Sequence, residues 1–286
     1  MEETIYLNGK LVPVSKAKIS VLDYGFLCGY GLYETIRAYD GKPFRLDAHL
    51  ARIIYSADRL GILLHAGILR QAVLDTVKAN GFKDTRIRIT VSIGEGSITP
   101  NIASCTEPTI AVLVTEYRPP APIMYRQGYK VIVSSIRRNS RSPVTYMKSA
   151  SSLENMLARQ ESRRAGADEA LFRNERGYVS EAAGSNVFIV SGGTLKTPRF
   201  ETGILPGVTR VVLFEVAAGL GMKVKEKNIT LDEVLHADEA FVTNSLIEVV
   251  PVTEVGGQKI GAGNPGPVTK RLASAYKRLV KKETGA

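Results

Sequence analysis

A run of prolines near the middle of the chain most limits how this sequence can fold. Arg118-Pro119-Pro120-Ala121-Pro122 contains three prolines in five residues, and each proline fixes φ and lacks a backbone N–H group. The run therefore predicts a stiff extended linker and a domain boundary. We expect a small domain over residues 1–118, a linker over 119–123 and a large domain over 124–286.

Helix-like and strand-like patterns are mixed in both halves, which predicts an α+β fold for each domain. In the first half we expect hairpins around Asn8-Gly9 and Asp40-Gly41, helices over 46–60 and 66–79, and strands over 86–93 and 109–114. In the second half we expect a strand over 130–136, helices over 152–165 and 208–220, several short strands and a basic final helix.

Several classes of protein do not fit this composition. Apolar runs such as 109–115 have the length of a strand, far below the roughly 18–20 residues of a membrane-spanning helix, so no membrane partner is expected. The acidic N-terminus lacks the pattern of a signal peptide, which predicts a cytoplasmic protein. Cys28 and Cys105 are expected to be reduced thiols, and the three histidines are too dispersed to suggest a metal site.

The net charge of +10 raises the question of nucleic-acid binding. Basic residues cluster in the expected final helix, namely Lys270, Arg271, Lys277, Arg278, Lys281 and Lys282. Only Tyr276 is interleaved with them and no nucleic-acid motif is present. We therefore expect a solvated basic face and no nucleic-acid partner, since surplus charge for anionic small molecules explains the composition equally well.

Two glycine-containing segments precede expected helices. The segment 261–266 has the letters of a dinucleotide-binding motif, but a βαβ unit with a later acidic residue has no room to follow it and Pro265 interrupts the loop, so it predicts only a turn and a helix start. Leu205-Pro206-Gly207 leads directly into an apolar helix whose first amides have no internal partner. Such a terminus can bind an anion such as a phosphate, and Thr209 would add a hydroxyl group.

Three charged residues stand out in their local sequence. Lys148 lies among small and apolar residues just ahead of an expected helix, where partial removal from water favours Schiff-base chemistry. Glu181 lies between two strand signals, and Arg52 lies on a helix rich in Ile and Leu. Each alone is more often an ordinary solvated group than a functional one.

Taken together and in order, the motifs resemble those of the class IV, fold-type IV pyridoxal-phosphate enzymes over nearly the whole chain. That family comprises branched-chain amino-acid aminotransferases, D-amino-acid aminotransferases, (R)-amine transaminases and aminodeoxychorismate lyases. The motifs are Gly31-Leu-Tyr-Glu-Thr-Ile-Arg37, Arg45-Leu-Asp-Ala-His-Leu-Ala-Arg52, Lys148, Glu181-Ala-Ala-Gly-Ser-Asn-Val-Phe, Leu205-Pro-Gly-Val-Thr-Arg210 and Glu248-Val-Val-Pro-Val.

The resemblance implies a role for each matching residue. Lys148 matches the lysine that forms a Schiff base with pyridoxal 5′-phosphate, and Glu181 matches the carboxylate that keeps the pyridine nitrogen protonated so that the ring can accept electrons. The cofactor-binding set is completed by Arg52, Leu205, Val208, Thr209 and Ser245. The substrate pocket is matched by Tyr33, Thr35, Arg37, Arg88, Leu246 and Ile247, the last two in the turn whose amides hold the substrate carboxylate.

Some residues depart from the branched-chain pattern. Thr35 stands where branched-chain enzymes usually carry glycine, Leu153 where they carry tyrosine, and Thr243-Asn-Ser-Leu246 where they carry Thr-Gly-Thr-Ala. Thr35 resembles the proton-relay residue of the lyases. By contrast, the segments 6–13, 18–23 and 36–47 read much like branched-chain enzymes.

We therefore expect a ping-pong aminotransferase that acts on branched-chain L-amino acids and 2-oxoglutarate, with their keto acids as products. The alternatives are an aminodeoxychorismate lyase, a D-amino-acid or (R)-amine transaminase, and a non-enzymatic anion-binding protein. The resemblance also implies a homodimer or a higher homo-oligomer.

Overall fold

The computed structural model describes residues 2–286, and the chain divides into two compact units. Unit 1 comprises the described part of Met1–Arg118 together with Met147–Ser151 and Glu283–Ala286, and unit 2 comprises Pro119–Tyr146 and Ser152–Lys282. A short segment around Lys148 thus belongs to unit 1, although the chain on both sides of it belongs to unit 2.

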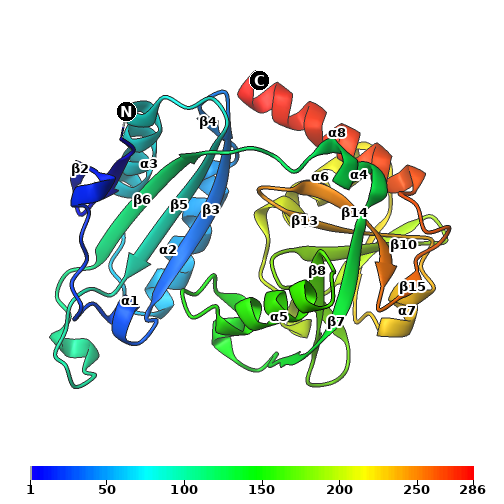
Figure 1. Cartoon of the computed structure of the whole chain (residues 1–286), viewed down its shortest axis with the longest axis horizontal. Coiled ribbons are helices and arrows are strands. Elements are labelled where there is room, and N and C mark those ends of the chain that lie inside the picture. Colours follow the sequence, from blue (N-terminus) through cyan, green and yellow to red (C-terminus); the bar gives the residue numbers. More distant parts are fainter. Residues whose placement is uncertain (1) are drawn as a thin grey trace. The chain divides into compact units, whose positions relative to one another are not determined.

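Unit 1 is built on a six-stranded antiparallel sheet in the order β2-β1-β6-β5-β3-β4. Its elements are β1 (Thr4–Leu7), β2 (Lys10–Pro13), α1 (Tyr24–Leu27), β3 (Gly31–Tyr39), β4 (Lys42–Pro43), α2 (Leu46–Arg59), α3 (Ala66–Asn80), β5 (Thr85–Ser92) and β6 (Thr109–Glu116). Helices α2 and α3 cover one face of the sheet (Figure 1). The predicted hairpins, helices and strands of this half are confirmed, with bounds within two residues.

Alternation along β3 separates a buried face from a polar one. Leu32 and Ile36 are almost fully buried in the core that α2 and α3 share with the sheet. Successive side chains of a strand point to opposite faces. Tyr33, Thr35 and Arg37 therefore lie on the face of the sheet away from these helices.

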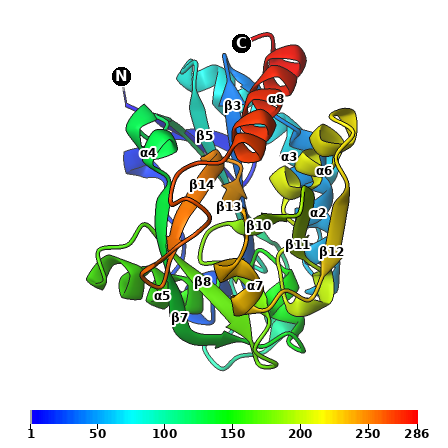
Figure 2. The same cartoon turned by 90° about the vertical axis from the view of Figure 1, so that its right-hand side faces the viewer.

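Unit 2 contains a nine-stranded mixed sheet in the order β12-β11-β10-β13-β14-β7-β8-β9, with β15 paired to β14. Its strands are β7 (Tyr129–Arg138), β8 (Glu169–Asn174), β9 (Val179–Ala182), β10 (Asn186–Ser191), β11 (Thr194–Pro198), β12 (Val224–Lys227), β13 (Glu239–Asn244), β14 (Glu248–Val255) and β15 (Gln258–Lys259). Its helices are α4 (Pro122–Gln127), α5 (Leu153–Arg164), α6 (Val208–Gly219), α7 (Leu231–Leu235) and α8 (Pro267–Thr284). Figure 2 shows β10, β13 and β14 side by side, below α8 in the view.

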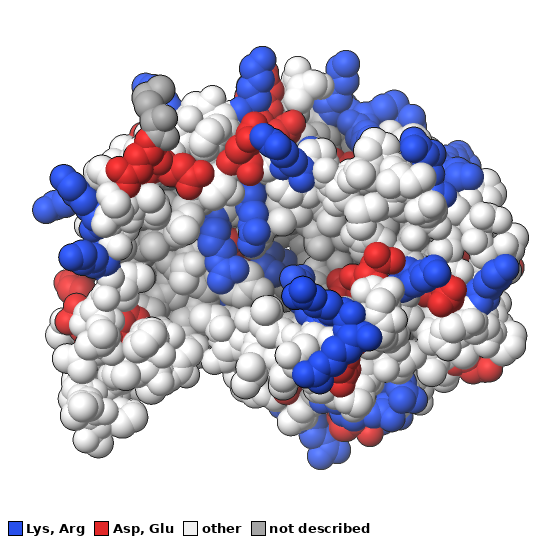
Figure 3. All heavy atoms as spheres, in the orientation of Figure 1, with Lys and Arg blue, Asp and Glu red and all other residues white. Residues whose placement is uncertain are grey.

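The final helix separates its apolar and basic residues. Leu272, Tyr276 and Val280 are buried at a spacing of four residues, so they form one stripe of α8. The six basic residues of this helix are all exposed, and Figure 3 shows Lys and Arg gathered along the α8 side of the drawn face. The predicted solvated basic face is confirmed.

Two local features differ from or extend the predictions. Pro122 and Ile123 begin α4 and do not continue an extended linker, because proline is well tolerated at the first position of a helix, where its missing N–H group has no intrahelical partner. The segment 261–266 is a loop before α8, as predicted. Among residues 2–286, no helix combines the length and apolar character needed to cross a bilayer.

Candidate active site

Lys148 is positioned by strand-like pairing within unit 1. The N–H group of Tyr33 donates to the carbonyl oxygen of Lys148 at 2.8 Å, and Ala150 donates to the carbonyl oxygen of Gly31 at 2.8 Å. Leu32 and Ser149 form an antiparallel bridge between these two hydrogen bonds. The backbone of Lys148 is therefore fixed to the first half of β3, and its Nζ lies 4.6 Å from the centroid of the Tyr33 ring.

Arg88 shares the Tyr33 ring with Lys148. Its Cζ lies 3.6 Å from the ring centroid, and its Nε donates to Thr90 Oγ1 at 3.2 Å. Burial lowers the pKa of the Arg88 guanidinium from its ordinary value. Thr35 is paired with Arg88 in the register of β3 and β5, so the two side chains project from the same face of the sheet.

Arg37 lies further along the same face, in a different environment. It is buried, its Nη2 lies 3.6 Å from Asp84 Oδ1, and its guanidinium stacks over the rings of Tyr39 and Tyr117 at 4.2 and 5.0 Å. The structure therefore brings Lys148, Tyr33, Thr35 and Arg88 together, whereas Arg37 is held by an aromatic cluster at the end of β3.

Arg52 lies on the helix-covered side of β3, where it binds a carboxylate that the sequence analysis missed. Its Nε and Nη2 donate to Glu34 Oε1 and Oε2, both at 2.7 Å, and His49 Nδ1 lies 2.8 Å from Glu34 Oε2. Glu34 is fully buried, and the side chain of Arg52 is 10% exposed. This is a bidentate, charge-assisted pair, which fixes the orientation of the guanidinium.

The charges of this cluster are set by the same contacts. Burial alone would raise the pKa of the Glu34 carboxyl, but the Arg52 charge and the hydrogen bonds from His49 and Arg52 hold that pKa well below its usual range. Burial lowers the pKa of His49, against the opposing effect of its bond to Glu34. The cluster thus holds a buried carboxylate between an imidazole and a fixed arginine.

Glu181 is held by three donors within unit 2. Arg138 Nη2 lies 3.3 Å from its Oε1, and its Oε2 accepts from the Leu205 N–H group at 2.9 Å and from Asn186 Nδ2 at 3.4 Å. Arg138 is buried, and its Cζ lies 4.3 Å from the centroid of the Phe172 ring. The carboxylate is therefore fixed in one orientation and faces a positive charge.

The loop before α6 is tied to the same carboxylate. Asn186 Nδ2 also donates to the Leu205 carbonyl oxygen at 3.0 Å, and a Cβ atom on Gly207 would lie 1.9 Å from Asn186 Oδ1. Only glycine leaves room for this contact at the residue that caps α6. Val208 and Thr209 follow in the first turn, and the first amides of a helix can bind an anion.

The remaining predicted residues lie in the turn between β13 and β14. The N–H groups of Leu246 and Ile247 both donate to Asn244 Oδ1, at 2.9 and 3.0 Å. Ser245 lies in the same turn, and Glu248 after it has a φ of 61°. The two amides that the resemblance assigns to a substrate carboxylate are thus bound by a side chain of the protein itself.

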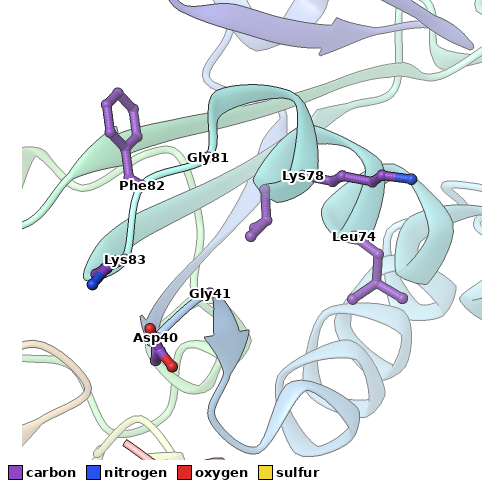
Figure 4. Close-up of a pocket in the computed structure, with 8 residues that line it drawn as sticks. Asp40, Gly41, Leu74, Lys78, Gly81, Phe82 and Lys83 are labelled. Atoms are coloured by element: carbon purple, nitrogen blue, oxygen red, sulfur yellow. The ribbon is translucent and has the colours of Figure 1, made fainter.

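Sequence reasoning therefore missed the residues that support the predicted ones, namely Glu34, His49, Arg138, Asn186 and Asn244. Glu34, His49 and Asn186 stand inside motifs quoted for the resemblance, and Asn244 stands inside a segment that departs from the branched-chain pattern. Those positions were the available signal. A separate pocket of about 290 Å³ in unit 1, next to the end of α3, contains none of the predicted site residues (Figure 4). It is lined by Asp40, Gly41, Leu74, Val77, Lys78, Gly81, Phe82 and Lys83.

Comparison with known proteins identifies the family of this chain. A model of the family "Amino-transferase class IV" matches residues 31–255. The chain is 38% identical to a putative branched-chain-amino-acid aminotransferase of Methanocaldococcus jannaschii, over 96% of each chain. It is 34% identical to the aminodeoxychorismate lyase of Bacillus subtilis, over 97% of this chain and 94% of the relative.

Solved structures match over nearly the full length as well. The branched-chain amino acid aminotransferase of Escherichia coli has a TM-score of 0.94 at 30% identity, covering 99% of this chain and 96% of that chain. The T.th. branched-chain amino acid aminotransferase complexed with N-(5′-phosphopyridoxyl)-L-glutamate has a TM-score of 0.92 at 32% identity, covering 100% and 95%. The two-domain α+β fold predicted from the sequence is thereby confirmed as that of the fold-type IV enzymes, and the chain belongs to the class IV aminotransferases, whose cofactor is pyridoxal 5′-phosphate.

Proposed function

We propose that this protein moves amino groups between branched-chain L-amino acids and 2-oxoglutarate. The observation that carries the proposal is the placement of Lys148, whose amine is held against Tyr33 by pairing of its backbone with β3. The names of the relatives at 38% and 30% identity support the branched-chain substrates.

The residues of each unit fit the chemical groups of the cofactor. Lys148 offers an amine for a carbonyl, Glu181 offers a fixed carboxylate for a pyridinium nitrogen, and the first turn of α6 offers amides and the Thr209 hydroxyl for a phosphate. When bound, pyridoxal 5′-phosphate supplies the carbonyl that takes up the amino group and the ring that accepts the electrons of the Cα–H bond.

The protein's own residues then position groups and move protons. Glu181 keeps a proton on the pyridine nitrogen, because its carboxylate is held in one orientation by Leu205, Asn186 and Arg138. With the cofactor and substrate bound, Lys148 Nζ would act as the base that takes the proton from the substrate Cα and returns it to the cofactor. Release of the keto acid would leave the amino group on the cofactor for transfer to 2-oxoglutarate.

Aminodeoxychorismate lyase is the second candidate. Thr35 favours it, because its side chain projects from the same face of β3 as Tyr33 and is paired with Arg88. A hydroxyl at this position can relay a proton to a departing pyruvate fragment, whereas a transaminase needs only space there. The Bacillus subtilis relative at 34% identity carries the name of this lyase.

One set of assays separates the candidates. Purified holoenzyme is mixed separately with L-leucine and 2-oxoglutarate, with D-alanine and 2-oxoglutarate, with an (R)-amine and pyruvate, and with aminodeoxychorismate. We expect glutamate and 4-methyl-2-oxopentanoate from the first mixture, and Thr35→Gly should keep this rate within about tenfold, which is about 1.4 kcal/mol in the barrier. Absence of this transfer, together with Thr35-dependent release of pyruvate and 4-aminobenzoate, would establish the lyase.

We also propose that the protein is a homodimer. Val21, Phe26 and Ile98 in unit 1 are 70%, 74% and 81% exposed, and their segments are joined by the bridge between Asp23 and Glu95. Clustered apolar side chains of this kind mark an interaction surface, and a second copy of the chain is the commonest partner. Sedimentation velocity of the holoenzyme should give the mass of a dimer or a larger assembly, and a monomer would contradict the proposal. A cytoplasmic location stays a prediction.

A further inference from the structure

Two arginines lie next to each other on the parallel strands β7 and β8 of unit 2. Arg137 and Arg173 are register partners in this pair of strands, which Figure 1 shows side by side. Neighbouring strands lie about 4.8 Å apart, and register partners point to the same face of the sheet. The next residue, Arg138, places its guanidinium over the ring of Phe172, which belongs to the opposite face. The side chains of Arg137 and Arg173 therefore project together from the face that carries Leu171.

Arg173 differs from two other arginines of unit 2 that are also partly or fully buried. Each of the three has a buried Nε atom without a hydrogen-bond partner. Arg138 and Arg210 place another nitrogen of the guanidinium against a carboxylate, that of Glu154 and that of Glu226. Within residues 2–286, the guanidinium of Arg173 has no hydrogen bond and no ion pair.

The neighbouring guanidinium adds a second uncompensated charge. Arg137 is exposed, and its guanidinium also lacks an ion pair in the described part of the chain. Like charges directly opposite each other on neighbouring strands are destabilising. A desolvated N–H group without an acceptor, such as Arg173 Nε, costs further free energy. An anion bound between the two guanidiniums would remove both costs.

We propose that Arg137 and Arg173 form a binding site for a phosphate group, separate from the residues that fit the cofactor. The two side chains together carry two positive charges and present two sets of donors. A single carboxylate has one charge and two oxygens, which one guanidinium can satisfy. A phosphate group carries up to two charges and offers three or more oxygens, so it matches the pair. The ligand is inorganic phosphate or a phosphate monoester, and the site does not depend on the proposed transfer reaction.

The test uses holoenzyme dialysed free of unbound cofactor, so that the position for the cofactor's own phosphate is filled. Binding of inorganic phosphate, glycerol 3-phosphate and succinate is measured by titration calorimetry at constant ionic strength. We expect saturable binding of phosphate, and Arg173→Gln should weaken it at least about tenfold, because hydrogen bonds between charged groups are lost. Arg137→Gln should weaken it as well. Because Arg137 is exposed, this second variant tests the site even if Arg173→Gln does not fold.

Arg176→Gln is the matched control. It removes the same charge three positions after Arg173, but Arg176 Nε already lies 3.6 Å from Glu175 Oε1. A charge outside the site acts only through attraction that salt screens, so the affinity for phosphate should change by less than about twofold.

Three results overturn the proposal: no saturable binding of phosphate to wild type, unchanged affinity in both Arg173→Gln and Arg137→Gln, or the same loss in Arg176→Gln. Succinate carries two charges on two carboxylates. If the binding that depends on Arg173 is as tight for succinate as for phosphate, the assignment to a phosphate group is wrong. Glycerol 3-phosphate distinguishes the two sources of the ligand: binding at least as tight as that of phosphate assigns the site to monoesters, and weaker binding assigns it to the free ion.

Discussion

Replacing Glu34 with glutamine should destabilise the protein strongly at neutral pH and much less in acid. The carboxylate is fully buried and binds both Arg52 and His49. Glutamine keeps one acceptor oxygen, but its amide group places a donor against the N–H groups of Arg52. Removing one partner of a buried ion pair costs about 3–5 kcal/mol, and we expect a loss near the lower end of this range because one contact is retained.

The pH dependence follows from the direction of the shift. The pKa of the Glu34 carboxyl in the folded protein lies well below its ordinary value of 4.5, so folding favours the charged form. The resulting stability is fully present above the unfolded-state value and is lost as pH falls toward the lower folded-state value. The difference in unfolding free energy between wild type and Glu34→Gln should therefore be largest at pH 7 and shrink below about pH 4.

Urea unfolding followed by circular dichroism at pH 7, 5 and 3.5 measures this difference. Glu161→Gln is the matched control, because the Glu161 carboxylate accepts hydrogen bonds from the hydroxyl groups of Ser134 and Ser135, which carry no charge. Glu161→Gln should lower the unfolding free energy at pH 7 by less than Glu34→Gln does. A Glu34→Gln penalty below about 1 kcal/mol at pH 7, or a penalty that stays constant into acid, would refute the assignment of a strong buried pair.

Three further predictions concern the cofactor. Borohydride reduction and peptide mapping should find the pyridoxyl label on Lys148, and a label on any other lysine would contradict its proposed role. Glu181→Gln should retain the cofactor but slow its conversion to the pyridoxamine form in single-turnover spectra, because a neutral amide no longer favours the protonated ring nitrogen; a rate equal to that of wild type would remove Glu181 from this role. Arg52→Ala should lower the free energy of cofactor binding by about 1.5–3 kcal/mol, so that more cofactor is lost on dialysis. This loss should not add to the loss caused by Glu34→Gln, since Glu34 orients Arg52. Full additivity would mean that the two residues act separately.

The sequence predicted most of the secondary structure because that information is local. The spacing of Leu50, Ile53 and Ala57 defines one face of α2, and all three are buried in the core of unit 1 as that spacing requires. The start of α6 at Val208 was also visible, since Pro206 and Gly207 mark it directly. α4 was missed because its short run of residues follows a proline-rich segment that usually reads as extended.

The supporting residues of the site depend on contacts between distant parts of the chain. Glu34 lies on the same face of β3 as the apolar residues Leu32 and Ile36, and its burial follows from the packing of α2, which brings His49 and Arg52 against it. Arg138 reaches Glu181 across 43 positions of sequence. Asn244 was noticed as a departure from the branched-chain pattern, but its bonds to Gly184 and Ser185 come from the pairing of β10 with β13. The spacing of residues within one segment does not predict such contacts with distant segments.

The interruption of unit 2 by Met147–Ser151 also affects how this chain is synthesised and dissected. A fragment that ends at Arg118 would leave the backbone groups of Gly31 and Tyr33 without the segment that pairs with them, and an uncovered strand edge promotes association with other chains. On the ribosome, β3 gains this pairing only after the first part of unit 2 has been made. Lys148 thus belongs to the segment that completes unit 1. A nascent chain therefore cannot complete unit 1 before part of unit 2 has been synthesised.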